Sequence, residues 1–201
     1  DKCKWSIVSV PTKPWAHKIF PDVSEEEAVE KLWDLIFKCT RVDNDDPVSA
    51  WHEHNENLKE KTDFLNEKNF KTLKYKSAKT DLTIGLPDNH TWESGASIDP
   101  NGVNFNPNMP TEEIFTLPHK YQVNGVVHSS KPLVYGGNVI DDFSLTFKDG
   151  KIIECSAVKG EETLKNLIET DEGSHYLGEV ALVPYSSPIS DTNVVFYNTL
   201  Y

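Results

Sequence analysis

The sequence has few cysteines and no long run of apolar residues. Cys3, Cys39 and Cys155 form an odd, widely spaced set, which excludes a disulfide framework and a CxxC metal site. No apolar run approaches the ~18 residues of a membrane-spanning helix, and no signal peptide is recognisable. We therefore expect a cytoplasmic protein with reduced thiols that does not enter a membrane.

Positive charge is also scarce. The 201 residues carry 20 Lys and Arg against 32 Asp and Glu, which gives a net charge of -12. This balance disfavours nucleic acid as a partner, because its phosphates bind Lys and Arg. The hydrophobic content of 37% and the charged content of 26% are typical of a globular protein with a buried core.

Motifs of several common enzyme classes are absent. No Gly-rich loop has the spacing of a phosphate-binding or dinucleotide-binding loop. Ser186 and Ser187 lack the G-x-S-x-G nucleophile elbow. The stretch from His52 to Glu56 resembles the HExxH zinc motif, but Glu56 stands where the second His must be, so we reject that zinc site.

The first third of the chain has helical periodicity. Ser24 and Glu27 form a capping box before an amphipathic helix. Asp46-Pro47 begins a second, longer helix that we expect to end near Asn69. Before these helices we expect a strand over residues 5–10 and an irregular link over residues 11–15.

The rest of the chain has the alternating pattern of strands. Leu82, Ile84 and Leu86 alternate with polar or small residues. Asp149-Gly150 indicates a hairpin, and residues 161–170 indicate a short helix. A strand is expected at residues 194–197. The predicted fold class is α+β, with N-terminal helices followed by mostly antiparallel strands.

Two carboxylate positions stand out from these patterns. Glu112 and Glu113 follow a long loop, residues 87–110, whose length favours a functional role. One of the pair can face a site and the other solvent. Glu179 interrupts a strand that otherwise reads as buried, where an ionised carboxylate needs a cation. A shared metal ion satisfies both positions. The simpler readings are a helix N-terminus at residues 111–113 and a Lys or Arg partner for Glu179.

Four stretches carry a resemblance to a known family: residues 80–86, 108–116, 177–183 and 196–201. They resemble the aminopeptidase T, aminopeptidase S and peptidase S family of bacterial two-metal aminopeptidases. The resemblance implies that Glu113 and Glu179 bind two divalent metal ions, with Zn, Co or Mn as candidates. It also implies that the remaining ligands lie beyond Tyr201, that substrates are peptides with a free N-terminus, and that the full-length protein is a homodimer.

The resemblance also implies a domain organisation. Both ends look cut, and the chain resembles the central piece of a larger two-domain enzyme. Residues 1–70 are expected to end an N-terminal domain, and residues 71–201 to form part of the metal-binding catalytic domain. One alternative is a non-catalytic interaction or dimerisation module on the same scaffold. Another is a metal-free hydrolase, such as a glycosidase, that uses Glu113 and Glu179 as its carboxylate pair.

Overall fold

A computed structural model describes residues 3–201 of the chain, which fold into two units. The first unit consists of the residues up to Phe64, Glu93–Ile114 and Leu182–Tyr201. The second consists of Leu65–Trp92 and Phe115–Ala181. The chain thus passes repeatedly from one unit to the other. The expected domains, 1–70 and 71–201 of a longer enzyme, stay a prediction.

The first unit contains three helices: α1 (Lys13–Ile19), α2 (Glu25–Cys39) and α3 (Pro47–Lys68), whose last turn belongs to the second unit. The capping box of α2 is confirmed on its N-cap side, because Ser24 Oγ accepts a hydrogen bond from the Glu27 amide at 3.2 Å. Helix α3 begins at the predicted proline. The prediction of an irregular link over residues 11–15 is wrong. Thr12 caps α1, and Pro14 lies in the first turn of this helix, where proline is tolerated.

The core of the first unit lies between α1 and α2. It is formed by buried apolar side chains of both helices and of the C-terminal segment: Ala16, Ala28, Leu32, Ile36, Cys39 and Phe196. Residues 194–197 are not the predicted strand. Instead, Phe196 is buried and stacks on Tyr201 with ring centroids 4.5 Å apart, and the Trp15 indole N–H donates to the Phe196 carbonyl. An irregular segment thus covers the two helices.

The strand predicted over residues 5–10 is reduced to one β-bridge, between Ile7 and Asn108. Ile7 donates to the Pro107 carbonyl at 2.7 Å, and Met109 donates to the Ile7 carbonyl at 3.0 Å. The apolar residues Ile7, Val8 and Val10 are all exposed. The alternating pattern therefore has no buried face to stabilise a longer strand.

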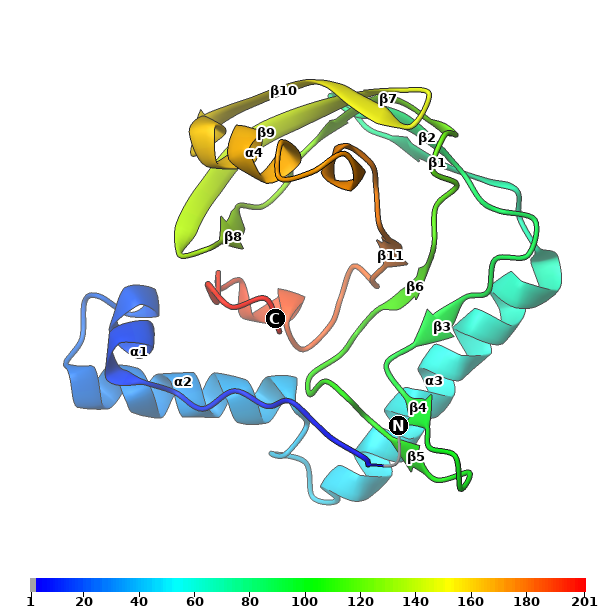
Figure 1. Cartoon of the computed structure of the whole chain (residues 1–201). Helices are drawn as coiled ribbons and strands as arrows, with labels where there is room; N and C mark the ends of the chain where they lie inside the picture. Colours follow the sequence, from blue (N-terminus) through cyan, green and yellow to red (C-terminus); the bar gives the residue numbers. More distant parts are fainter. Residues whose placement is uncertain (1–2) are drawn as a thin grey trace. The chain divides into compact units, whose positions relative to one another are not determined.

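The second unit is built on an antiparallel sheet of order β1-β2-β7-β9-β10, in which β8 pairs with β9 (Figure 1). Its strands are β1 (Thr72–Lys76), β2 (Asp81–Gly85), β7 (Val123–His128), β8 (Leu133–Tyr135), β9 (Asn138–Lys148) and β10 (Lys151–Lys159). Helix α4 (Glu161–Ile168) lies against this sheet. The pattern of one helix packed on antiparallel strands confirms the α+β class.

The sheet follows its local sequence signals. The predicted hairpin joins β9 and β10 through Asp149 and Gly150, both with positive φ. A Cβ on Gly150 would lie 1.8 Å from the Lys120 carbonyl oxygen, so only glycine fits this turn. Leu164 and Ile168 of α4 pack on Ile140 of β9 and form the core of this unit.

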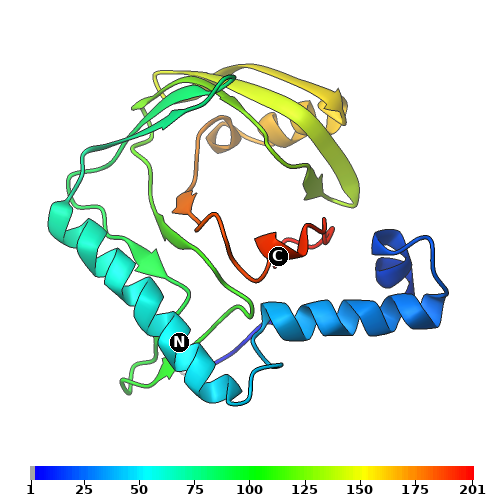
Figure 2. The ribbon, with the colours of Figure 1, turned by 180° about the vertical axis from the view of Figure 1, so that it is seen from behind.

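Short elements complete the chain. They are β3 (Glu93–Ser94), β4 (Ser97–Ile98), β5 (Asn104–Phe105), β6 (Ile114–Thr116), β11 (Val180–Leu182) and two 3-10 helices, Gly173–His175 and Ser190–Thr192. β4 and β5 pair with each other in the long loop, which lies along α3 (Figure 2). None of the helices in residues 3–201 has the length and apolarity that a membrane span requires.

Candidate functional site

The two predicted metal ligands each directly precede a short strand. Glu113 precedes β6 and is partly buried, whereas Glu179 precedes β11 and is exposed. Glu179 is therefore not the buried strand residue that the sequence predicted, because the buried part of that strand begins at Val180. Glu113 belongs to the first unit and Glu179 to the second. Their convergence on one site stays a prediction.

The buried carboxylate of this region is Glu112. Its relative exposure is only 7%, so it is not the solvent-facing member of the pair. The reading of residues 111–113 as a helix N-terminus is also wrong, since the chain has no helix there and continues into β6. A carboxylate with this burial requires a cationic partner.

Arg41 is that partner. Its Nη1 donates to Glu112 Oε1 at 2.7 Å and its Nη2 donates to Glu112 Oε2 at 3.1 Å. The two bonds form the bidentate geometry that only a guanidinium offers. Arg41 directly follows Thr40, the C-cap residue of α2. The backbone of Arg41 is left-handed, with a φ of 59°. Thr40 in turn accepts from the Trp51 indole N–H at 2.7 Å, which ties the end of α2 to α3.

His54 connects the same ion pair to the neighbouring peptide. Its Nε2 lies 2.7 Å from the Thr111 carbonyl oxygen, and its Nδ1 lies 3.1 Å from Arg41 Nη2. A carbonyl can only accept and a guanidinium can only donate, so we assign the neutral tautomer with the proton on Nε2. Burial lowers the pKa of His54, in agreement with a neutral ring.

Close packing holds the rest of the segment in place. A Cβ on Gly95 would lie 2.1 Å from Thr111 Cγ2. Any residue larger than glycine at position 95 would therefore clash with the Thr111 side chain. Ile7 bonds to both Pro107 and Met109, as described above. Together with Arg41 and His54, these contacts fix the backbone of residues 107–112 immediately before Glu113.

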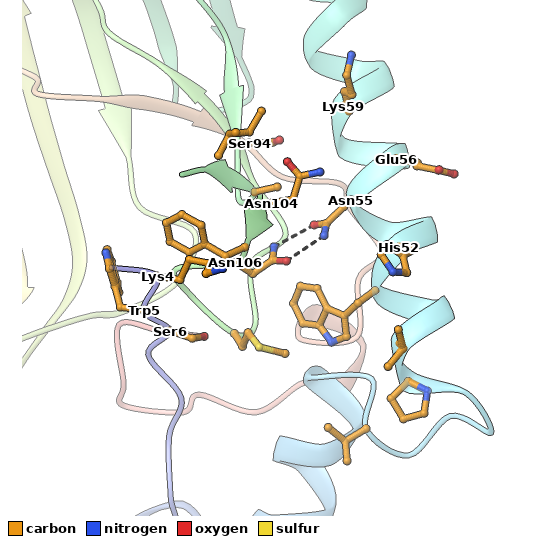
Figure 3. Close-up of a pocket in the computed structure, with 18 residues that line it drawn as sticks. Lys4, Trp5, Ser6, His52, Asn55, Glu56, Lys59, Ser94, Asn104 and Asn106 are labelled. Atoms are coloured by element: carbon orange, nitrogen blue, oxygen red, sulfur yellow. Dashed lines mark hydrogen bonds between the residues drawn. The ribbon is translucent and has the colours of Figure 1, made fainter. Parts of the chain in front are cut away.

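The described residues of the first unit enclose a smaller and a larger cavity. The smaller, of about 560 Å³, is lined by Arg41 and His54, together with Ser186 and Asp191. The larger, of about 980 Å³, lies between the N-terminal segment, α3 and the 93–109 loop (Figure 3). Apolar residues such as Trp51 line much of it, and Asn55 and Asn106 exchange two 2.9 Å hydrogen bonds at its wall. Neither of the predicted metal ligands, Glu113 and Glu179, is among the residues that line it.

The metal-binding capacity of the described residues is partial. Within residues 3–201, no three or more His, Cys, Asp or Glu side chains gather closely enough to hold a metal ion. The oxygen donors of Glu113 and Glu179 suit divalent metals chemically. Two carboxylates supply only part of a coordination shell, however, so this donor set requires further ligands.

Comparison with known proteins identifies the family. All 201 residues match the family described as Thermophilic metalloprotease (M29). The chain belongs to the M29 family. The resemblance found in the sequence motifs is thereby confirmed.

Relatives of this M29 chain are named aminopeptidases. It is 57% identical over 201 residues to Aminopeptidase AmpS of Bacillus subtilis and 54% identical over 201 residues to Aminopeptidase 2 of Geobacillus stearothermophilus. Each alignment covers 100% of this chain and 49% of the relative. A solved structure described as wild-type AmpT from Thermus thermophilus matches with a TM-score of 0.92 and 45% identity, over 98% of this chain and 48% of that one. The chain therefore spans about half the length of these relatives.

Sequence reasoning missed Arg41 and His54. The near-match to HExxH concerns His52 and Glu56, and the sequence assigned no role to His54, to which the structure gives a carbonyl and a guanidinium as partners. One signal was present: Arg41 is the only arginine in the sequence, and the other 19 of the 20 cationic Lys and Arg residues are lysines. A lone arginine in a lysine-rich chain indicates a position that needs the guanidinium geometry.

Proposed function

We propose that this chain is part of a metal-dependent aminopeptidase, in which Glu113 and Glu179 are two of the ligands of two divalent metal ions. The observation that carries this proposal is the match of all 201 residues to a metalloprotease family whose relatives are named aminopeptidases. Within residues 3–201 no three or more His, Cys, Asp or Glu side chains gather closely enough to hold a metal ion, and we propose that the remaining ligands come from segments outside this chain.

Paired metal ions, when bound, would lower the pKa of a water molecule and polarise the scissile carbonyl. The role of this chain is to hold Glu113 and Glu179 in position for them. We propose Zn, Co or Mn as the metal, peptides with a free N-terminus as substrates, and a cytoplasmic homodimer as the full-length protein. The net charge of -12 agrees with a substrate that carries a free ammonium group.

The contrast between neighbouring glutamates supports Glu113 rather than Glu112 as the ligand. Both carboxylate oxygens of Glu112 accept hydrogen bonds from Arg41, and the side chain is buried. A carboxylate engaged in this way is a poor ligand, since binding a metal would leave the partly buried guanidinium without its carboxylate partner. Glu113 is only partly buried.

The test uses the full-length protein with Glu113→Gln or Glu179→Gln. Each substitution removes a charge that the metal ions need, so we expect Zn²⁺ affinity and hydrolysis of an aminoacyl-p-nitroanilide to fall by more than about 100-fold, with little change in fold. Isothermal titration of chelator-treated protein with Zn²⁺ measures the affinity. Glu154→Gln, which alters an exposed glutamate of β10, is the matched control.

The outcomes separate the alternatives. Unchanged Zn²⁺ binding in Glu113→Gln and Glu179→Gln would refute their assignment as ligands. A full-length protein that neither binds metal nor cleaves peptides would favour the non-catalytic module. Hydrolysis that needs both glutamates but survives metal removal would favour the metal-free carboxylate pair.

A further inference from the structure

We propose that residues 5–10 form an open strand edge, and that in the full-length protein this edge pairs with a β-strand from outside these 201 residues. In the described chain, residues 4–12 contain neither a helix nor a turn. The strand that the sequence predicts here is present only as the bridge between Ile7 and Asn108. Pairing with a further strand would complete it, and metal binding is not required for this pairing.

One edge of the segment is already occupied. Ile7 donates to the Pro107 carbonyl at 2.7 Å and accepts from the Met109 amide at 3.0 Å, so both of its backbone groups point to that side. Backbone groups alternate in direction along an extended strand, so those of Ser6 and Val8 point to the opposite side. Among the described residues these groups have no backbone partner. The second edge is therefore open to another strand.

The segment is apolar on both faces. Trp5 and Ile7 lie on one face of an extended chain, and Val8 and Val10 lie on the other. The relative exposure of these four residues is between 46% and 61%. Near-continuous apolar sequence is typical of strands that are covered on both faces. A small molecule could not cover both faces, so the partner is a folded part of a protein.

The open apolar surface continues into the larger cavity. Trp5 and Ser6 line this cavity of about 980 Å³, together with Ile98 and Met109 (Figure 3). Ile98 is itself exposed. A contiguous exposed apolar surface of this kind marks a site of protein contact. We therefore expect the covering part of the protein to place apolar side chains in the cavity as well.

A different edge of the same chain is protected against pairing. β10 is the last strand in the sheet of the second unit and has Lys151 and Lys159 at its ends. The Glu161 carboxylate accepts from the Ala157 amide at 3.3 Å and closes part of this edge. Charged residues and blocked backbone groups are the means by which proteins prevent free edges from pairing. Residues 5–10 include no charged residue, so their edge lacks this protection.

The partner strand belongs to the same molecule. The chain spans only 49% of the length of each of the two aminopeptidase relatives compared above, so about half of each relative lies outside the matched region. A strand from that half is covalently linked to the segment and is present at a high effective concentration. A second copy of the chain would have to associate first.

The test is amide hydrogen exchange on the full-length protein, read at single residues by mass spectrometry with fragmentation. We expect the Val8 and Val10 amides to exchange at least about 100-fold more slowly than an unprotected amide. The reference is the amide of Gly137, an exposed turn residue. The Ser9 amide should exchange faster than its two neighbours, because pairing at one edge engages every second residue. This protection should persist when the protein is diluted about 100-fold, since an intramolecular contact does not depend on concentration.

A substitution on the open face provides the second measurement. Val8→Lys places a charge where the covering strand packs, and we expect it to speed exchange of the Val10 amide by at least about tenfold. Val158→Lys makes the same change at an exposed valine of β10 and is the matched control. The control should leave the exchange of residues 5–10 at the wild-type rate.

Several results would overturn the proposal. One is exchange of the Val8 amide at the reference rate, and another is wild-type protection in Val8→Lys. Equal protection of Val8, Ser9 and Val10 would mean that the segment is covered without strand pairing. Protection that disappears on dilution would assign the contact to a second copy instead of the same molecule. All of these readings are independent of bound metal, so a failure of the proposed function would not change them.

Discussion

Removing Arg41 should destabilise the first unit more than removing its partner. In Arg41→Gln the carboxylate of Glu112, whose side chain is 6% exposed, loses both of its bonds to the guanidinium. His54 Nε2 lies 3.8 Å from Glu112 Oε1 but is already bonded to Thr111. An uncompensated buried charge costs about 3–5 kcal/mol, so we expect the free energy of unfolding to fall by about 4 kcal/mol.

Glu112→Gln should cost less, about 2 kcal/mol. The Arg41 guanidinium, at 14% side-chain exposure, keeps its contacts with the Cys39 carbonyl and His54, and the new amide oxygen still accepts one of its bonds. The double variant leaves no buried charge and should cost about 3 kcal/mol rather than about 6. A coupling energy of about 3 kcal/mol is therefore expected between the two positions.

Urea unfolding followed by tryptophan fluorescence measures these values. Four of the five tryptophans, Trp5, Trp15, Trp33 and Trp51, belong to the first unit, so the signal reports mainly on it. Lys31→Gln is the surface control and should change stability by less than about 0.5 kcal/mol. A cost below about 1 kcal/mol for Arg41→Gln would mean that the pair behaves as a solvated surface ion pair. Costs that add fully in the double variant would also refute the reasoning.

Three further results are expected. Iodoacetamide at pH 8 should modify exposed Cys3 rapidly and Cys39 only in denaturant, because burial raises the Cys39 thiol pKa to about 11; equal labelling in the native state, read by mass spectrometry, would contradict this. Burial lowers the His54 pKa, so on acidification the unfolded state binds a proton at this histidine before the folded state does, and stability should fall as pH drops below about 6.5. In His54→Gln the urea midpoint of unfolding should depend less on pH in this range. The 201-residue chain alone should bind Zn²⁺ weakly and show no peptidase activity, because Glu113 and Glu179 form only part of a shell; micromolar binding of two metal ions with turnover would overturn this.

Elements with strong local signals could be predicted from the sequence. The capping serine of α2, the proline at the start of α3 and the Asp-Gly turn between β9 and β10 each act over a few residues. Their effect on the backbone is therefore independent of the rest of the fold. The α+β class followed from these elements together.

Elements that depend on distant partners were predicted wrongly. The apolar residues at positions 5–10 and 194–197 resemble in sequence those of a true strand. At residues 5–10 the described structure has a single β-bridge, from Ile7 to Asn108, and Phe196 packs on α1 and α2. Strand propensity reflects packing against neighbours, and sequence alone does not identify those neighbours.

The predicted site illustrates the same limit at the level of single charges. The argument that a carboxylate among apolar residues needs a cation is physically sound, and the structure satisfies it at Glu112. The cation there is a guanidinium from 71 residues away, which no local pattern reveals.

A structural carboxylate and a metal-binding carboxylate differ in the burial that they require. A structural carboxylate is buried and keeps a permanent partner, as Glu112 does, whereas a metal ligand must remain accessible until the metal binds. The exposure of Glu179 and the partial burial of Glu113 therefore do not weaken their assignment as ligands. Burial is evidence for the Arg41–Glu112 ion pair. The proposed ligands depend on the family motifs, so metal affinity rather than stability is the measurement that tests them.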